Sequence, residues 1–347
     1  MLGAPYRAGH SRTGAPYDAD TMSVPDTGGV DPAVRIVSLL PAATEIIAAL
    51  GLTGSLVGRS HECDEPTEVT GLPALTAAAI DAGRSSRAIH EAVGAAYATA
   101  AGGTPALFRL DAALLAAVRP DLIVTQAACD VCAVSADDVG RAVQALGRPV
   151  PIVTLAPTTL ADLWRDILAV AAATGTLPRG RTLVARLQAR CRSIACRVES
   201  LARLAGGPRP RVAVIEWLDP PMAAGNWVPE LVALAGGEDV LGRAGHHSHW
   251  IGWEDVAHAD PDIVILAPCG FTRDRIVAEA TTGEIWQRLA SLRATRSGRL
   301  FAIDGHHLLN RPGPRLVDSL EVLSAVLHPG WFAFPAVERH VTRLGGD

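Results

Sequence analysis

Short apolar runs alternate with longer stretches of helical periodicity along most of the chain. In the first half, the apolar runs have the length of buried strands and lie at 35–40, 55–60, 121–126 and 151–156. Helical candidates lie between them, at 44–51, 86–102 and 111–119. This alternation predicts an α/β lobe with a mainly parallel sheet.

A long helical region separates this half from a second, similar half. Helical periodicity extends from about 159 to 205 and is interrupted by "LPRG" at 177–180, since Pro and Gly break helices. Strand-like runs then return at 212–217, 262–268 and 299–305, with helical candidates at 227–236, 283–294 and 314–328. The whole pattern predicts two α/β lobes with one long helix between them.

The division of the chain follows from these patterns. Residues 1–32 are rich in Gly, Pro, Ser, Thr and Asp, without periodicity, and therefore predict a disordered tail. That segment lacks the apolar centre of a signal peptide, and no later run of about 18 apolar residues exists, so we expect a cytoplasmic chain without a membrane span. The expected segments are a tail at 1–32, an N-terminal lobe at 33–157, a helical region at 158–207, a C-terminal lobe at 208–332 and a C-terminal tail at 333–347.

Composition, charge and the absence of common motifs exclude several classes of function. With 49% hydrophobic and 19% charged residues, the chain can bury large cores. Its net charge is −5, it contains no lysine, and it has no basic stripe of the kind that a nucleic-acid-binding protein needs. Walker, G-x-G-x-x-G, G-x-S-x-G and H-E-x-x-H motifs are also absent, so we assign no catalytic residues and expect no enzyme.

Polar and chemically versatile residues collect directly after the predicted strands. The stretches "SLLPAATE", "SHECDEP" and "QAACDVC" do so in the first half, and "EWLDPP", "CGF" and "DGHHLLNRPGPR" in the second. The carboxyl ends of parallel strands form crevices that bind ligands, so we expect a cleft between the lobes. The candidate ligand-binding residues are Ser38, Pro41, Thr44, His61, Glu62, Cys63, Asp64, Gln126, Cys129, Cys132, Glu216, Trp217, Asp219, Asn226, Trp227, Trp253, Cys269, Gly270, Phe271 and Arg311.

Cys129 and Cys132 have the spacing of a metal or redox pair. A structural zinc site needs four ligands, and Cys63, Cys269 or His61 would complete one only if their loops converge. A thioredoxin-like couple fits the spacing but not a two-lobe architecture. Two further interpretations are thiols that line a pocket and small buried side chains. We favour reduced thiols lining the pocket, with a metal site second and a disulfide last.

The aromatic and basic residues suggest the kind of ligand. Seven tryptophans are many for a chain with three tyrosines and five phenylalanines. Trp217 and Trp227 lie near one edge, in "EWLDPP" and "AGNWVPE", and Trp253 lies in "HHSHWIGWE". Large flat side chains around a cleft suit a large, partly apolar ligand, although core packing is the alternative. Arg311 and Arg315 flank a Pro-Gly turn just before a helix, a suitable place to hold an anionic group.

Five stretches resemble the cobalamin and iron-siderophore class of ABC-transporter substrate-binding proteins, in particular its cobalamin-binding branch. They are "RIVSLLPAATEIIAALGLTGSLVGRSHECDEP", "RPDLIVTQAACDVCAV", "EWLDPPMAAGNWVPELVALAGG", "IGWEDVAHADPDIVILAPCGF" and "DGHHLLNRPGPRLVDSLEVL". The resemblance covers about residues 34–330. It implies two Rossmann-like lobes with mainly parallel sheets, joined by one long backbone helix, with the ligand between them.

The resemblance also implies a ligand and a partner. The expected ligand is a corrinoid or a related metal chelate, with no required cofactor, and zinc or iron as the alternative. The expected partner is an ABC permease, for which Asp111 and Glu230 are the docking candidates. Transport members of this class are periplasmic or extracytoplasmic. The rival hypothesis is a cytosolic metal-binding or thiol-dependent enzyme that uses Cys63, Cys129, Cys132 and Cys269.

Overall fold

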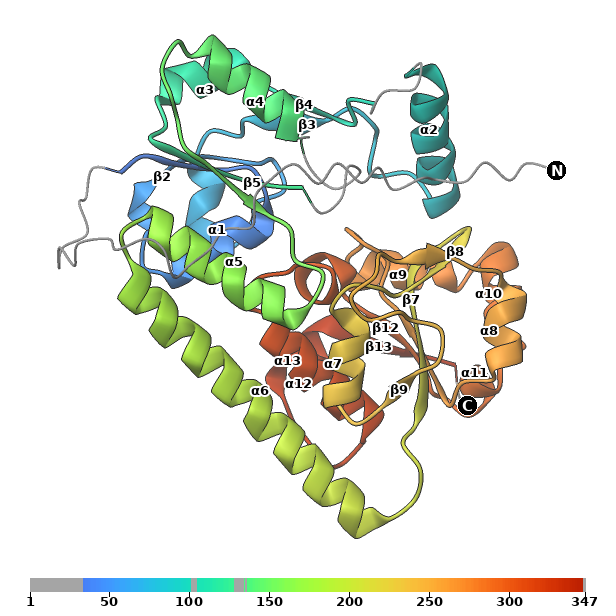
Figure 1. The fold of residues 1–347 in the computed structure, drawn as a ribbon. Helices are drawn as coiled ribbons and strands as arrows, with labels where there is room; N and C mark the ends of the chain where they lie inside the picture. Colours follow the sequence, from blue (N-terminus) through green and yellow to red (C-terminus); the bar gives the residue numbers. More distant parts are fainter. Residues whose placement is uncertain (1–33, 101–104, 128–133, 135, 346–347) are drawn as a thin grey trace.

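The computed structural model describes residues 34–100, 105–127, 134 and 136–345 (Figure 1). The expected tail at 1–32 and the pair Cys129 and Cys132 lie outside the described residues. The described chain forms two α/β lobes, with one long helix along the side of both (Figure 1). The predicted fold class is therefore confirmed.

The N-terminal lobe is built on a parallel sheet with the strand order β2-β1-β5-β6. All four predicted strands are present, as β1 (Ile36–Ser38), β2 (Leu56–Arg59), β5 (Leu122–Gln126) and β6 (Ile152–Leu155). A separate hairpin pairs β3 with β4, and four helices and two short 3-10 turns complete the lobe. These elements are β3 (Thr76–Ala78), β4 (Phe108–Leu110), α1 (Pro41–Ala49), α2 (Ser86–Thr99), α3 (Ala112–Val118), α4 (Ala136–Ala145), η1 (Thr53–Ser55) and η2 (Thr67–Gly71).

The C-terminal lobe has a larger, mixed sheet with the order β10-β8-β7-β11-β12-β13, in which β9 also pairs with β7. Its parallel centre consists of the three predicted strands β7 (Arg211–Leu218), β11 (Ile263–Leu266) and β12 (Leu300–Ile303). The other elements are β8 (Pro221–Ala223), β9 (Glu238–Asp239), β10 (His249–Trp250), α7 (Val228–Leu234), α8 (Trp253–Ala259), α9 (Arg273–Ala280), α10 (Gly283–Ala290), α11 (Arg293–Arg296), η3 (Gly305–Leu309) and α12 (Leu316–Leu327).

The connecting region consists of α5 (Leu160–Ala173) and the 29-residue helix α6 (Leu177–Ala205). The predicted break at 177–180 is wrong by a few residues, because "LPRG" forms the first turn of α6. Pro178 is tolerated there, since the first N–H groups of a helix have no intrahelical partner. A Cβ on Gly180 would lie 2.4 Å from Ala171 Cβ, so glycine permits the close approach of α5 and α6.

The end of the chain, for which we expected a tail at 333–347, forms secondary structure in its described part. Residues 335–344 form α13 (Pro335–His340) and β13 (Val341–Leu344), and β13 pairs antiparallel with β12. Leu344 is buried in the core of the C-terminal lobe. A four-residue strand that contains Thr342 and Arg343 has too little hydrophobic pattern to be predicted, and its pairing with the edge of the sheet stabilises it.

One hydrophobic core extends through both lobes. A single cluster of buried side chains includes Ile46 of α1, Ile167 of α5, Leu187 of α6, Val212 of β7 and Leu320 of α12. Further clusters cover the other face of each sheet. In the described part of the chain, no helix combines the length and the apolar character that crossing a membrane requires.

Candidate functional site

The loop after β2 meets the loop after β12 at the contact between the lobes. Asp64 of the first loop accepts a hydrogen bond from Arg311 at 2.7 Å between Oδ1 and Nη1. Its Oδ2 lies 2.8 Å from Nε2 of His306 and 3.4 Å from Nε2 of His307. Both loops follow the carboxyl ends of parallel strands, so the predicted convergence of these ends is seen for this pair of loops.

Glu45 extends this contact into a buried network of charges. Its side chain is 7% exposed and accepts hydrogen bonds from Arg311 at 3.0 Å and from Arg315 at 3.0 and 2.6 Å. Gly313 lies between the two arginines, and a Cβ there would lie 3.1 Å from Glu45 Oε2. The Pro-Gly turn therefore brings both guanidinium groups of the C-terminal lobe onto a carboxylate of the N-terminal lobe.

The histidines and carboxylates of this network shift one another's pKa values. Burial alone would raise the pKa of Asp64, but hydrogen bonds from His306, His307 and Arg311 outweigh it and hold the pKa far below its usual range. Hydrogen bonds to Asp304 and then Asp64 raise the pKa of His307 to about 9. The carboxylates of Asp304 and Asp64 on either side of His307 therefore favour its protonated form.

Helix α2 makes a second contact between the lobes, and in Figure 1 it lies over the C-terminal lobe. The indole Nε1 of Trp217 donates to Ser86 O at 3.2 Å, and Ser86 N donates to Glu279 at 2.8 Å. Arg87 pairs with Asp219 at 2.8 Å. Because these bonds lie at the first turn of α2, they fix the start of this helix to the other lobe.

Three predicted ligand residues of the N-terminal lobe are buried in a hydroxyl–thiol network. Thr44 Oγ1 lies 2.8 Å from Ser38 Oγ and 3.0 Å from Cys63 Sγ, and all three side chains are buried. They hold the start of α1 against the loop after β2. The remaining candidates of this lobe, which are half-buried, are Pro41, His61, Glu62 and Gln126.

The predicted residues of the C-terminal lobe also divide into buried and accessible groups. Glu216 is buried and accepts a hydrogen bond from Ser248. Trp227 is buried as well, and its indole donates to Leu309 O at 2.8 Å. Phe271 is buried beneath the guanidinium of Arg275. The candidates that keep some exposure are Trp217, Asp219, Asn226, Trp253, Cys269 and Gly270.

The described cysteines do not assemble into a metal site. Among the described residues, two groups of candidate ligands have their ligand atoms within 4.8 Å of one another, and both consist of histidine and aspartate. They are Asp64 with His306 and His307, and Asp304 with His307 and His340. Cys63 and Cys269 belong to neither group, and both are free thiols.

The burial of Cys63 gives a testable prediction. Its side chain is 1% exposed, and burial raises the pKa of its thiol to about 11. Since the thiolate is the reactive form, Cys63 should resist a water-soluble disulfide reagent in the native protein, whereas the exposed Cys196 should react quickly. Peptide mapping after timed labelling would measure both rates, and similar rates for the two thiols would contradict the expectation.

Asp111 and Glu230, the candidates for docking to a permease, differ in their surroundings. Asp111 is exposed and caps α3, because its Oδ1 accepts from Leu114 N at 2.8 Å. Glu230 is half-buried, and its Oε2 accepts from Leu160 N at 3.1 Å at the start of α5. A carboxylate is favourable at a helix N-terminus, so Glu230 already has a partner within the chain.

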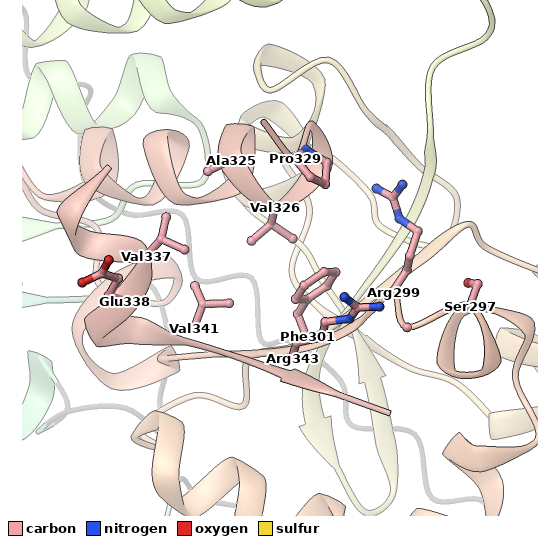
Figure 2. A pocket seen from close by; sticks show the side chains of 11 residues that line it. Ser297, Arg299, Phe301, Ala325, Val326, Pro329, Val337, Glu338, Val341 and Arg343 are labelled. Atoms are coloured by element: carbon pink, nitrogen blue, oxygen red, sulfur yellow. The ribbon is translucent and has the colours of Figure 1, made fainter. Parts of the chain in front are cut away.

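Two hollows lie away from the contact between the lobes. A groove of about 510 Å³ lies on the C-terminal lobe, and Figure 2 shows Phe301, Val337 and Arg343 among the side chains that line it. The other, of about 470 Å³, lies where the end of α1 meets the start of α6. No residue predicted for the ligand site lines either hollow. We therefore assign the candidate site by its converging polar groups.

Comparison with known families agrees with this two-lobe architecture. A family model described as periplasmic binding protein matches residues 36–306. The chain belongs to the periplasmic binding protein family. This family comprises substrate-binding proteins that bind small molecules and work with ABC transporters. No match was found among curated proteins.

Several solved structures share the fold at low sequence identity. A periplasmic heme binding protein from Pseudomonas aeruginosa is 23% identical, with a TM-score of 0.66, and covers 90% of this chain and 98% of its own. The periplasmic heme-binding protein RhuT from Roseiflexus sp. RS-1 is 24% identical, with a TM-score of 0.61, over 86% and 100% of the two chains. The periplasmic vitamin B12 binding protein BtuF of Vibrio cholerae is 20% identical, with a TM-score of 0.59, over 85% and 97%.

Proposed function

We propose that this member of the family binds a corrinoid or a closely related metal chelate between its two lobes. The observation that carries the proposal is the convergence of Asp64, Arg311 and Arg315 where the loops after β2 and β12 meet. Arginine pairs bind phosphate and carboxylate groups with charge-assisted hydrogen bonds, and corrinoids and hemes carry such groups at their periphery. The solved relatives named above that bind vitamin B12 or heme support this ligand class.

The contacts between the lobes indicate how the ligand would enter. The start of α2 lies against Trp217 and Asp219, and the network around Asp64 lies at the other contact. A ligand placed between the lobes would replace both sets of contacts with its own. Trp217, which is half-buried and packs edge-on to Phe271 at 5.3 Å between ring centroids, would supply a flat apolar surface.

Heme is the second candidate ligand, because two imidazoles lie at the same contact. Nε2 of both His306 and His307 points to the loop after β2, and histidine nitrogen is a common axial ligand of heme iron. If hemin binds, a change of His306 to alanine should alter its absorption spectrum. The same change should have little effect on a corrinoid that binds through its periphery.

The proposed function includes delivery of the bound ligand to an ABC permease. Asp111 is the stronger docking candidate, since its carboxylate is exposed beside the start of α3. Glu230 is the weaker docking candidate, because its Oε2 already accepts a hydrogen bond from Leu160 N. The burial of Cys63 keeps one of the four thiols that the rival hypothesis needs away from solvent.

Ligand titration tests the proposal directly. Cyanocobalamin, cobinamide and hemin are added separately to the protein while tryptophan emission and ligand absorbance are recorded. We expect saturable quenching at one ligand per chain, and Trp217→Ala should weaken binding by roughly 1–3 kcal/mol, the range for a buried aromatic anchor. Trp331→Ala is the control, because Trp331 stacks on His328 away from both contacts between the lobes. Unchanged emission with all three compounds would refute the proposed function.

A further inference from the structure

Three side chains of the kinds that ligate metal ions meet at the contact between the lobes. Asp64 comes from the loop after β2, and His306 and His307 come from η3 after β12. Asp64 Oδ2 lies 2.8 and 3.4 Å from the two Nε2 atoms, and the three ligand atoms lie within 4.8 Å of one another. A tetrahedral zinc ion about 2 Å from each ligand separates its ligand atoms by roughly 3.4 Å. Small side-chain movements, together with release of the proton that His307 carries towards Asp64, would therefore admit one ion.

The surroundings of His307 are those of an oriented metal ligand. Its Nδ1 lies 3.0 Å from Asp304 Oδ2, so the ring directs Nε2 towards Asp64. Asp304 is itself fixed, because its Oδ1 accepts hydrogen bonds from the backbone N–H groups of His306 at 3.0 Å and His307 at 2.8 Å. A carboxylate behind the ligating imidazole is the usual arrangement around zinc. The cluster thus has an ordered second layer as well as three ligands.

The two carboxylate oxygens of Asp64 have different partners. Arg311 binds Oδ1 of Asp64 and leaves Oδ2 for an ion. Its Nη2, 3.2 Å from His306 Nε2, must turn aside when an ion binds.

We propose that Asp64, His306 and His307 bind one divalent transition-metal ion of the zinc type at the contact between the lobes. Two imidazoles and one carboxylate suit zinc, cobalt(II) or nickel(II) better than magnesium or calcium, which prefer oxygen ligands alone. Three protein ligands leave a fourth position for water or an added ligand. Because the ligands come from both lobes, the ion joins the lobes, and its binding does not depend on a chelate.

Metal titration of the full chain tests this site without any chelate present. Protein treated with EDTA and dialysed is titrated with zinc sulfate by calorimetry, and with cobalt(II) by absorbance. We expect one ion per chain and cobalt ligand-field bands without thiolate charge transfer. His306→Ala and His307→Ala should each weaken binding at least tenfold, and Asp304→Asn should weaken it by about 10–100-fold, as expected for a second-layer carboxylate. His258→Ala, which changes an exposed histidine of α8, should leave the affinity unchanged.

The carboxylate ligand can be tested without a change in side-chain size. Asp64→Asn preserves the shape of the side chain and removes its charge, and it provides the same test if an alanine variant does not fold, as judged by circular dichroism. Affinity that is unchanged in His306→Ala, His307→Ala and Asp64→Asn would overturn the proposal. Thiolate-to-cobalt charge transfer would overturn it as well, by assigning the ion to cysteine. Neither result decides whether a corrinoid or heme binds, which the titration of tryptophan emission and ligand absorbance tests separately.

Discussion

Replacing Arg311 with alanine should lower the free energy of unfolding by about 3–5 kcal/mol, the range for removing one partner of a buried ion pair. The Arg311 side chain is only 5% exposed and binds Glu45 at 3.0 Å and Asp64 at 2.7 Å. Without it, Arg315 alone would face Glu45, and Asp64 would lose its only guanidinium partner within the described residues. Urea unfolding of the two proteins at neutral pH would measure the difference.

Two comparisons make this prediction specific. Arg288→Ala removes an ion pair to Glu254 of similar length, 3.1 Å, but with side chains 59% and 75% exposed, and should cost less than about 1 kcal/mol. Adding Glu45→Gln to Arg311→Ala should recover part of the loss, because it removes a charge that has lost one of its partners. A loss for Arg311→Ala no larger than that for Arg288→Ala would show that the network does not stabilise the fold.

Between about pH 5 and pH 8, stability should fall as the pH rises, and Glu216→Gln should reduce this fall. Burial raises the pKa of Glu216 from its ordinary value of 4.5 to about 8. The folded protein therefore keeps this proton up to about pH 8, whereas the unfolded chain releases it near pH 4.5. The contribution is fully present below pH 4.5, is lost as the pH rises to about 8, and amounts to on the order of 5 kcal/mol.

The comparison with the variant isolates Glu216 from other buried acids. Burial also raises the pKa of Asp166 to about 7 and that of Asp239 to about 6, so the wild-type slope has several sources. Glutamine preserves the shape of Glu216 and its hydrogen bond with Ser248, and has no charge to release. Glu91→Gln, at an exposed position of α2, is the matched control. Equal pH slopes for wild type, Glu216→Gln and Glu91→Gln would contradict the assignment.

The central strands and the bridging helix could be predicted because their sequence patterns are strong and local. Runs such as "DIVILAP" contain the buried strand Ile263–Leu266, and the apolar positions of α6 recur at helical spacing over 29 residues. The short edge strand Val341–Leu344 and α13 could not be predicted in the same way. Their stability comes from pairing with β12 and packing on the lobe, which a local pattern does not contain.

The sequence predicts which loops form the candidate site, but it does not predict which side chains of these loops contact one another. "SHECDEP" and "DGHHLLNRPGPR" lie at strand ends as expected, and Asp64 and Arg311 meet there. Glu45 and Arg311 are 266 residues apart in the sequence, so one sequence offers no sign of their contact. Glu45 escapes prediction because it lies within an apolar helix pattern. His306 and His307 directly follow Asp304 and Gly305 at the end of β12, and the adjacent pair of histidines is the signal that could have found them.

The core that continues from α1 through α5 and α6 to α12 has a consequence for how the molecule unfolds. Ile46, Ile167, Leu187 and Leu320 belong to one cluster of buried side chains, so neither lobe encloses its hydrophobic surface alone. Exposing that surface in one lobe removes packing from the other. We therefore expect the two lobes to unfold together, so that a destabilising change in either one lowers the melting temperature of both.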